Sequence, residues 1–144
     1  MPRFMMMMFP GPDAEKGVLP DAKILAEMGK FNEELVNSGV LLAGEGLHPS
    51  SKGVRVRYST GAPVVQDGPF AEAKEVIGGF WIIQAKSLHE ATAWAQKVPA
   101  RNGEMVEIRQ VFSPDDFAPV DPTGELRASE DELRRRAAAN NSKT

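Results

Sequence analysis

The sequence predicts an α+β fold built on an antiparallel sheet, and two observations carry this prediction. Its patterns run strand, helix, strands, strand, helix, strand, which makes two strand–helix–strand halves of similar size. The runs 3–9 and 79–85 are almost entirely apolar, which is typical of strands covered on both faces. Two such halves indicate a split βαβ arrangement, the ferredoxin-like plait, with both helices on one face of the sheet.

Length, composition and charge exclude several classes of protein. The 144 residues suit one domain with a substantial core, since 42% are hydrophobic and 26% are charged. A net charge of −3 gives no general reason to bind nucleic acid or an anionic membrane, and the absence of cysteine excludes thiol chemistry and disulfides. No run approaches the roughly 20 apolar residues that cross a bilayer. We therefore expect a cytoplasmic protein with neither nucleic-acid nor membrane partners.

The first half is predicted to be a strand at 3–9, a loop to Pro20, a helix over 21–38 and a strand at 40–43. Gly39 suits the residue after the helix, where glycine tolerates the left-handed conformation. The apolar helix positions recur at intervals of three and four residues, which places them on one face. They are Ile24, Met28, Phe31 and Leu35.

A hairpin and a second helix follow. We expect Gly44–Pro49 to leave the strand, 54–58 to be an alternating strand and 64–66 to be its short partner. After the apolar strand at 79–85, Ser87 and Glu90 form a capping box for a helix that ends near Val98. The inward residues of that helix are expected to be Leu88, Ala91, Trp94, Ala95 and Val98, and a last strand covers 105–112.

The apolar strands predict a partner for the sheet. In a plait the helices cover one face only, so a second element must cover the other. A second copy of the same sheet is the simplest cover, which predicts a homodimer with a shared, barrel-like interior.

The C-terminal segment is expected to be a polar tail. We place the main domain at 1–117 and the tail at 118–144, with a short helix starting at the capping pattern of Ser129 and Glu132. Its arginine run, 134–136, fits a solvated helix face better than a nucleic-acid site.

Four motifs together carry a resemblance to a known family. They are Gly44-Glu45-Gly46-Leu47, Asp67-Gly68-Pro69-Phe70 with the following Ala71–Glu75, Gly78-Gly79-Phe80, and Glu107-Ile108-Arg109. In these motifs the chain resembles the YCII-related family, in the branch named for its DGPF motif, over about residues 3–117. The resemblance implies a ferredoxin-like fold and a homodimer of the dimeric α+β barrel type. It also implies a histidine–aspartate pair, here His48 and Asp67, and a genomic context that includes sigma-factor-like proteins.

His48 and Asp67 each have a structural and a functional interpretation. An Asp before Gly-Pro can accept backbone N–H bonds and open a helical turn, or it can act as a general base or hold a histidine tautomer. His48 lies on a loop where the sheet should open, so it is either solvated or an acid–base group that works near neutral pH. With no cysteine and two histidines, we expect no metal and no cofactor.

Other charged residues are candidates for ligand binding. In-strand arginines facing a shared interior would hold a small anionic or aromatic acid through forked hydrogen bonds, or else pair with Glu45 or Glu107 and fix the dimer. Charged residues after the DGPF motif either gate the cavity or form a solvated turn. The ligand-binding candidates are Glu45, Arg57, Glu72, Lys74 and Arg109.

Two functions follow from these residues. The first is a cofactor-free enzyme with isomerase-, lyase- or hydrolase-like chemistry, which moves protons through His48 and Asp67 in a cavity at the dimer interface. The second is a non-catalytic module, linked to transcription regulation, that binds a ligand or a partner protein.

Overall fold

The computed structural model describes residues 1–143, which divide into a first unit, Met1–Val111, and a second unit that begins at Phe112. Thr144, the end of the expected tail, lies outside the described residues.

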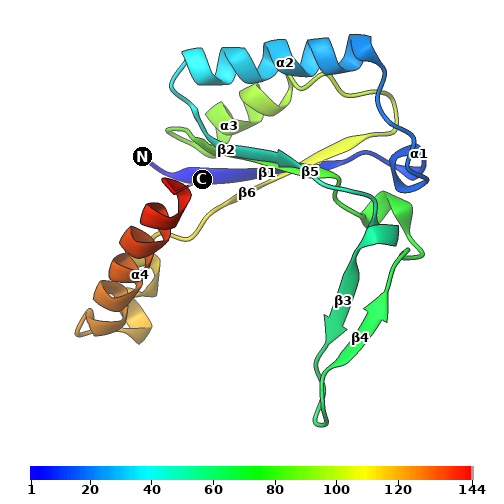
Figure 1. Cartoon of the computed structure of the whole chain (residues 1–144). Coiled ribbons are helices and arrows are strands. Elements are labelled where there is room, and N and C mark those ends of the chain that lie inside the picture. The colour runs from blue at the N-terminus through cyan, green and yellow to red at the C-terminus, as the bar shows by residue number, and fades with distance from the viewer. Residues whose placement is uncertain (144) are drawn as a thin grey trace. The chain divides into compact units, whose positions relative to one another are not determined.

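The first unit is built on a four-stranded antiparallel sheet (Figure 1). Its strand order is β2-β5-β1-β6, so each strand is paired with one that is distant in sequence. This order confirms the predicted α+β architecture with an antiparallel sheet. The strands are β1 (Arg3–Phe9), β2 (Leu41–Gly46), β5 (Gly79–Gln84) and β6 (Met105–Gln110).

Two helices, α2 (Ala22–Asn37) and α3 (Leu88–Ala95), lie on the same face of this sheet (Figure 1). Phe31 and Leu35 of α2 are buried, as the periodicity predicts. The ring of Phe31 meets Trp81 of β5 edge-on, with 5.6 Å between the ring centroids. Because apolar burial drives folding, this layer is the core of the unit. Its other members include Phe4, Met6, Met8, Ile83, Ala91 and Val98.

The ends of the helices follow the predicted signals, with two differences in α3. Asp21 accepts from the backbone N–H of Ile24 at 2.9 Å, and Ser87 accepts from that of Glu90 at 3.2 Å. The helix α3 ends at Ala95 and not at Val98. The expected inward position of Leu88 is wrong, because this residue of the first helical turn is 55% exposed.

The second face of the sheet is also rich in apolar side chains. Residues of β1 are alternately buried and half-buried, so Met5 and Met7 lie on the face opposite the helices. Phe80 and Ile82 of β5 pair with Met7 and Met5 and are half-buried on that same face. No element of the first unit reproduces there the helix layer of the other face (Figure 1).

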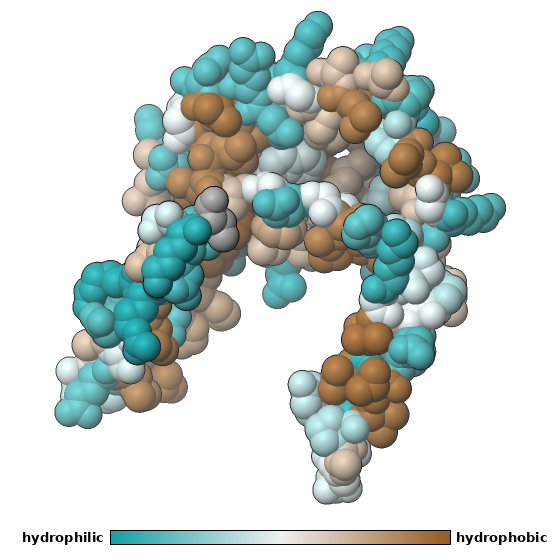
Figure 2. Space-filling model, viewed as in Figure 1, coloured by the Kyte–Doolittle hydropathy of each residue, from teal (hydrophilic) through white to brown (hydrophobic). Residues whose placement is uncertain are grey.

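The strands β3 (Val54–Arg57) and β4 (Val64–Asp67) form a separate two-stranded sheet (Figure 1). The expectation that Gly44–Pro49 leaves the preceding strand is wrong at its start, because β2 runs on through Gly46 and pairs there with Gly79. The hairpin then begins after a short turn, η1 (Ser50–Lys52). Apolar side chains lie exposed along it, as Figure 2 shows in brown. Two short helical turns complete the unit, α1 (Pro12–Glu15) and η2 (Ala73–Glu75).

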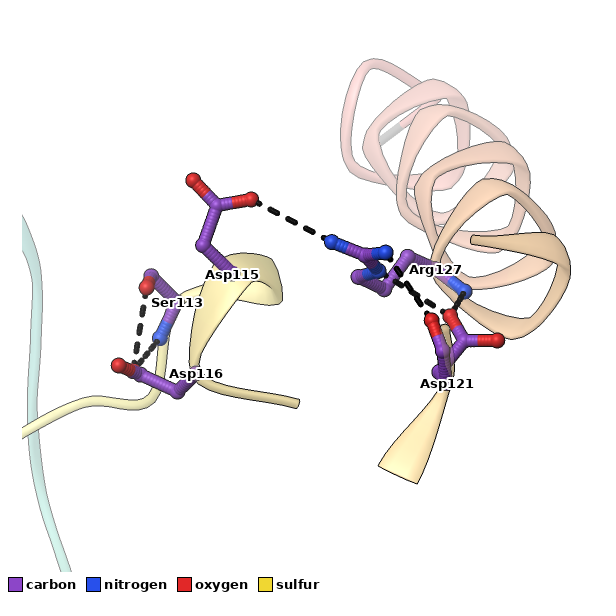
Figure 3. Close-up of polar contacts among 5 residues, drawn as sticks. All are labelled: Ser113, Asp115, Asp116, Asp121 and Arg127. Carbon is purple, nitrogen blue, oxygen red and sulfur yellow. Dashed lines mark hydrogen bonds and ion pairs between the residues drawn. The ribbon is translucent and has the colours of Figure 1, made fainter. Parts of the chain in front are cut away.

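The second unit consists of η3 (Pro114–Val120) and the helix α4 (Glu125–Asn141). The predicted helix start near Ser129 is wrong, since α4 begins four residues earlier and is 17 residues long. The buried carboxylate of Asp121 accepts from the backbone N–H groups of Leu126 at 3.2 Å and Arg127 at 3.0 Å (Figure 3). It therefore caps the first turn of α4 from outside the helix.

Arg127 completes this cap. Its Nε lies 3.1 Å from the Asp121 carboxylate, and its guanidinium also faces Asp115 at 3.6 Å (Figure 3). Burial raises the pKa of the Asp121 carboxyl, but the hydrogen bonds from Arg127 and Leu126 and the Arg127 charge outweigh burial and hold the pKa below its ordinary value.

Among residues 1–143, no helix is both long enough and apolar enough to span a membrane.

Candidate functional site

A cavity of about 310 Å³ lies between α2 and the β2–β5 edge of the sheet. Glycine creates it. Gly44 pairs with the buried Trp81 and Gly46 with the buried Gly79, so all four residues face the helix layer. Three of these four residues are glycines without a side chain, so an unfilled space remains between α2 and the β2–β5 edge of the sheet.

Gly44 and Gly46, the two glycines of β2, have different surroundings in the cavity wall. A side-chain carbon at Gly44 would contact Cδ1 of Trp81 at 3.2 Å, so glycine there lets the indole lie close against the strand. A side-chain carbon at Gly46 would meet nothing within 4 Å. Gly46 therefore faces the open part of the cavity, where a larger side chain would occupy ligand space.

The walls of the cavity are mainly apolar. Asn32 is the polar side chain that lines it, whereas Glu45 alternates with Gly44 and Gly46 and borders the cavity through its backbone. The indole Nε1–H of Trp81 donates to Oδ1 of Asn32 at 2.8 Å. The apolar side chains that complete the wall are Met8, Met28, Leu41 and Trp81.

Backbone groups also border the cavity, because β2 is an edge strand. In an antiparallel pair, alternate residues direct their backbone groups at the partner strand. Leu47 donates its backbone N–H to the carbonyl of Gly78 at 2.9 Å. The backbone N–H and C=O groups of Glu45, two residues earlier, therefore also point toward β5. The N–H and C=O groups of Gly44 and Gly46 consequently point away from β5, along the open edge.

The DGPF motif lies elsewhere, at the base of the β3–β4 hairpin. Gly68 donates its backbone N–H to the carbonyl of Gly53 at 3.0 Å, and the N–H of Phe70 donates to Oγ of Ser50 at 3.1 Å. The guanidinium of Arg55 lies over the ring of Phe70, 3.7 Å from its centroid. The motif therefore joins both strands of the hairpin to the η1 turn.

A carboxylate from a distant helix fixes that turn. Oε1 of Glu15 accepts from the backbone N–H of Ser50 at 2.8 Å, and its Oε2 accepts from the Ser50 hydroxyl. The Ser50 side chain is thus buried with its hydroxyl both donating and accepting. Such a satisfied group holds the hairpin base in one geometry.

His48 and Asp67 lie at the same end of this hairpin. His48 is two residues before Ser50, and Asp67 pairs with Val54 at the end of β4. Both side chains are exposed, and among residues 1–143 neither makes a side-chain hydrogen bond or ion pair, with the other or elsewhere. The helical turn that the structural interpretation places at Asp67 lies later, in η2, which begins after Glu72.

The other predicted binding residues are spread over three places. Glu45 and Arg109 are exposed on the two edge strands of the main sheet, opposite Phe80 and Met5 respectively. Arg57 belongs to the hairpin, where its Nε donates to Gln66 at 3.0 Å. Glu72 and Lys74 are exposed around η2. Of these five, only Glu45 belongs to the cavity wall, which it borders through its backbone.

Sequence reasoning missed Asn32, Glu15 and Ser50. Asn32 had a detectable signal, since it stands four residues after Met28 and beside Phe31, on the edge of the apolar stripe. Glu15 and Ser50 are 35 residues apart, and no local pattern joins them. The described residues contain no group of three or more His, Asp or Glu side chains arranged to hold a metal ion.

The fold and site together define a small α+β protein with a glycine-lined cavity beside an edge strand and a hairpin whose base is held by the DGPF motif. The family is shown by comparison with known proteins. The YCII-related domain matches residues 3–115, and the chain belongs to this family. The predicted resemblance to the YCII-related family is therefore confirmed.

A relative in Rhizobium meliloti (strain 1021), itself described as an uncharacterized protein, is 33% identical to this chain over 82 residues. The match spans 57% of this chain and 66% of the relative, slightly less than two thirds of its length.

Proposed function

We propose that this protein binds a small molecule in the cavity between α2 and the β2–β5 edge. The observation that supports this proposal is the convergence of two motif segments on one space. Gly44 and Gly46 come from the first segment and Gly79 from another, more than thirty residues later, and all line the cavity. A largely apolar, concave space with few polar groups is the usual form of a ligand site.

Binding is favoured over catalysis by the residues that line this space. An acid–base enzyme needs two titratable groups that reach the same ligand. The polar side chain in the cavity wall is the amide of Asn32, since Glu45 borders the cavity through its backbone. An amide suits recognition, because it directs hydrogen bonds without exchanging protons.

We further propose membership of the DGPF branch, a ferredoxin-like plait and a homodimer. The branch rests on the Asp67–Phe70 motif, and the plait rests on the strand order β2-β5-β1-β6. The dimer rests on the apolar open face formed by Met5, Met7, Phe80 and Ile82. A second copy would cover this face and leave the cavity on the helix side accessible.

The test uses the two indole N–H signals of the protein in a proton–nitrogen NMR spectrum. Trp81 lines the cavity, whereas Trp94 lies on α3 with Lys97 over its ring, and serves as the internal control. Indole, phenol, benzamide and benzoate are titrated singly. We expect a member of this set to shift the Trp81 signal and leave Trp94 in place.

Two matched variants complete the design. Gly46→Val fills the cavity and should abolish the Trp81 shift. Gly61→Val makes the same change at the tip of the hairpin, where a side-chain carbon also meets nothing within 4 Å, and should leave the shift intact. If no compound moves Trp81, or if both variants respond like the parent, the proposed function is wrong.

A second candidate is the acid–base enzyme that uses His48 and Asp67. It is favoured by one observation, that both residues lie at the base of the same hairpin, beside the buried Ser50. A dyad would require their side chains to come into hydrogen-bond contact when a substrate or a second copy closes over them.

A further inference from the structure

We propose that the cavity selects uncharged planar amides, such as primary carboxamides and lactams, and that Asn32 is the residue that selects them. This inference rests on the proposed function. The inference goes beyond the proposed function by naming the class of ligand and the hydrogen bonds that would recognise that ligand.

The orientation of the Asn32 side chain carries the first step. An indole N–H can only donate, so the atom of Asn32 that lies 2.8 Å from Trp81 Nε1 is the amide oxygen. The NH₂ group therefore takes the opposite direction. Trp81 is itself held against Phe31 in the core, so it fixes the amide in one orientation.

The hydrogen-bonding capacity left on Asn32 is the second step. Its NH₂ group makes no hydrogen bond to any residue in the range 1–143, and its oxygen retains one lone pair beside the bond to Trp81. It thus offers a donor and an acceptor side by side. A ligand amide offers the complementary acceptor and donor, and the two groups pair reciprocally in one plane.

The charge and volume of the cavity give the third step of the argument. No arginine, lysine or histidine lines the cavity, and the one acidic residue of its wall, Glu45, borders it through its backbone. An anionic ligand would lose its hydration there without gaining a counter-charge, which is costly. The volume of about 310 Å³ lies at the lower end for ligand sites, and the flat indole of Trp81 with the methionines favours a planar ligand.

Benzamide and benzoate make a matched pair of probes, because they share a ring and a carbonyl but differ in charge and in the N–H donor. Affinities come from the Trp81 indole signal. We expect benzamide to bind at least about tenfold more tightly than benzoate, since one well-formed hydrogen bond and the avoided burial of charge each contribute on this scale.

The variant Asn32→Asp keeps the oxygen that accepts from Trp81 and removes the NH₂ donor. We expect it to weaken benzamide binding by about tenfold and to leave indole binding within about threefold, because indole has no acceptor for Asn32. Retained indole binding also shows that the cavity is folded. If the variant fails to fold, the comparison of benzamide with benzoate in the parent protein decides.

The outcomes separate the two proposals. If indole binds but benzoate equals or exceeds benzamide, the amide preference is wrong and the proposed function stands. The same conclusion follows if benzamide binding is unchanged by Asn32→Asp. If no probe shifts Trp81 in the parent protein, both proposals are wrong.

Discussion

Gly68 lies so close to Ser50 that a side-chain carbon on Gly68 would come within 1.7 Å of the Ser50 carbonyl oxygen. This close approach of the Gly68 and Ser50 backbones joins the DGPF motif to the turn that starts the hairpin. Because the facing atoms belong to the backbone, they cannot move aside as the end of a side chain can. The glycine of the motif is therefore a packing requirement of the hairpin base.

The first prediction concerns Gly68→Ala. The added methyl group must displace the backbone at Ser50, and we expect a loss of about 3 kcal/mol in the free energy of unfolding. Chemical denaturation measures it. Gly61→Ala is the control, since its side-chain carbon meets nothing within 4 Å, and should change stability by less than about 1 kcal/mol. Equal stability of the two variants would contradict the packing argument.

The second prediction concerns Ser50→Ala. The change removes the acceptor of the Phe70 N–H and the hydroxyl that bonds to Glu15. An unsatisfied buried group costs about 1–3 kcal/mol, so we expect a loss in this range together with faster hydrogen exchange at the Phe70 amide. The control is Ser51→Ala, at the exposed residue next to Ser50, which should leave the Phe70 amide protected from hydrogen exchange. Unchanged exchange at Phe70 in Ser50→Ala would refute the assigned bond.

The sequence predicted the sheet and helices because these elements follow local rules. The spacing of Phe31 and Leu35 specified the buried face of α2, and the apolar run at 3–9 specified the strand β1. The helix caps at Asp21 and Ser87 are equally local. Such signals lie within a few residues, so one chain is sufficient to detect them.

The cavity and the hairpin base could not be predicted because they depend on pairing across long stretches of sequence. Gly46 contributes to a cavity only because Gly79 pairs with it, and Glu15 reaches Ser50 only after β1 and α1 are in place. The cap of α4 was misplaced for a related reason. Asp121 lies outside the helix it caps, and the pattern at Ser129 was a false start signal.

The third prediction concerns pH and the second unit. The pKa of the Asp121 carboxyl is lower in the folded protein than its ordinary value of 3.8. The carboxylate therefore stabilises the fold fully above that value, and this contribution is lost as the pH falls through the lower folded pKa. We expect the amide signals of α4 to report this loss in an acid titration of the full chain.

Two variants isolate the effect of Asp121. Asp121→Asn should make the stability of α4 independent of pH in this range, whereas Asp131→Asn, on the exposed surface of α4, should titrate as the parent does. If Asp121→Asn retains the full acid transition, the capping carboxylate is not its cause.

The fourth prediction concerns the open sheet face. Lysine at Ile82 would place a charge in the middle of this face, and burying an unpaired charge against a second copy costs several kcal/mol. We expect the parent to be a dimer at micromolar concentration in light scattering and Ile82→Lys to be a monomer. Val36→Lys, at an exposed position of α2, should remain dimeric. A monomeric parent would refute the dimer.

The fifth prediction discriminates the acid–base dyad from the binding protein. If a dyad forms, the Asp67 carboxylate accepts from one ring nitrogen of His48 and selects one tautomer. Long-range proton–nitrogen NMR spectra report the tautomer, and the exposed His89 at the start of α3 is the internal control.

We expect no interaction between His48 and Asp67 in the protein alone, because neither exposed side chain makes a hydrogen bond with the other. Asp67→Asn should then leave the His48 ring signals unchanged. A change in those signals, with His89 unaffected, would instead establish contact between the two side chains, and a search for substrates of the enzyme would follow.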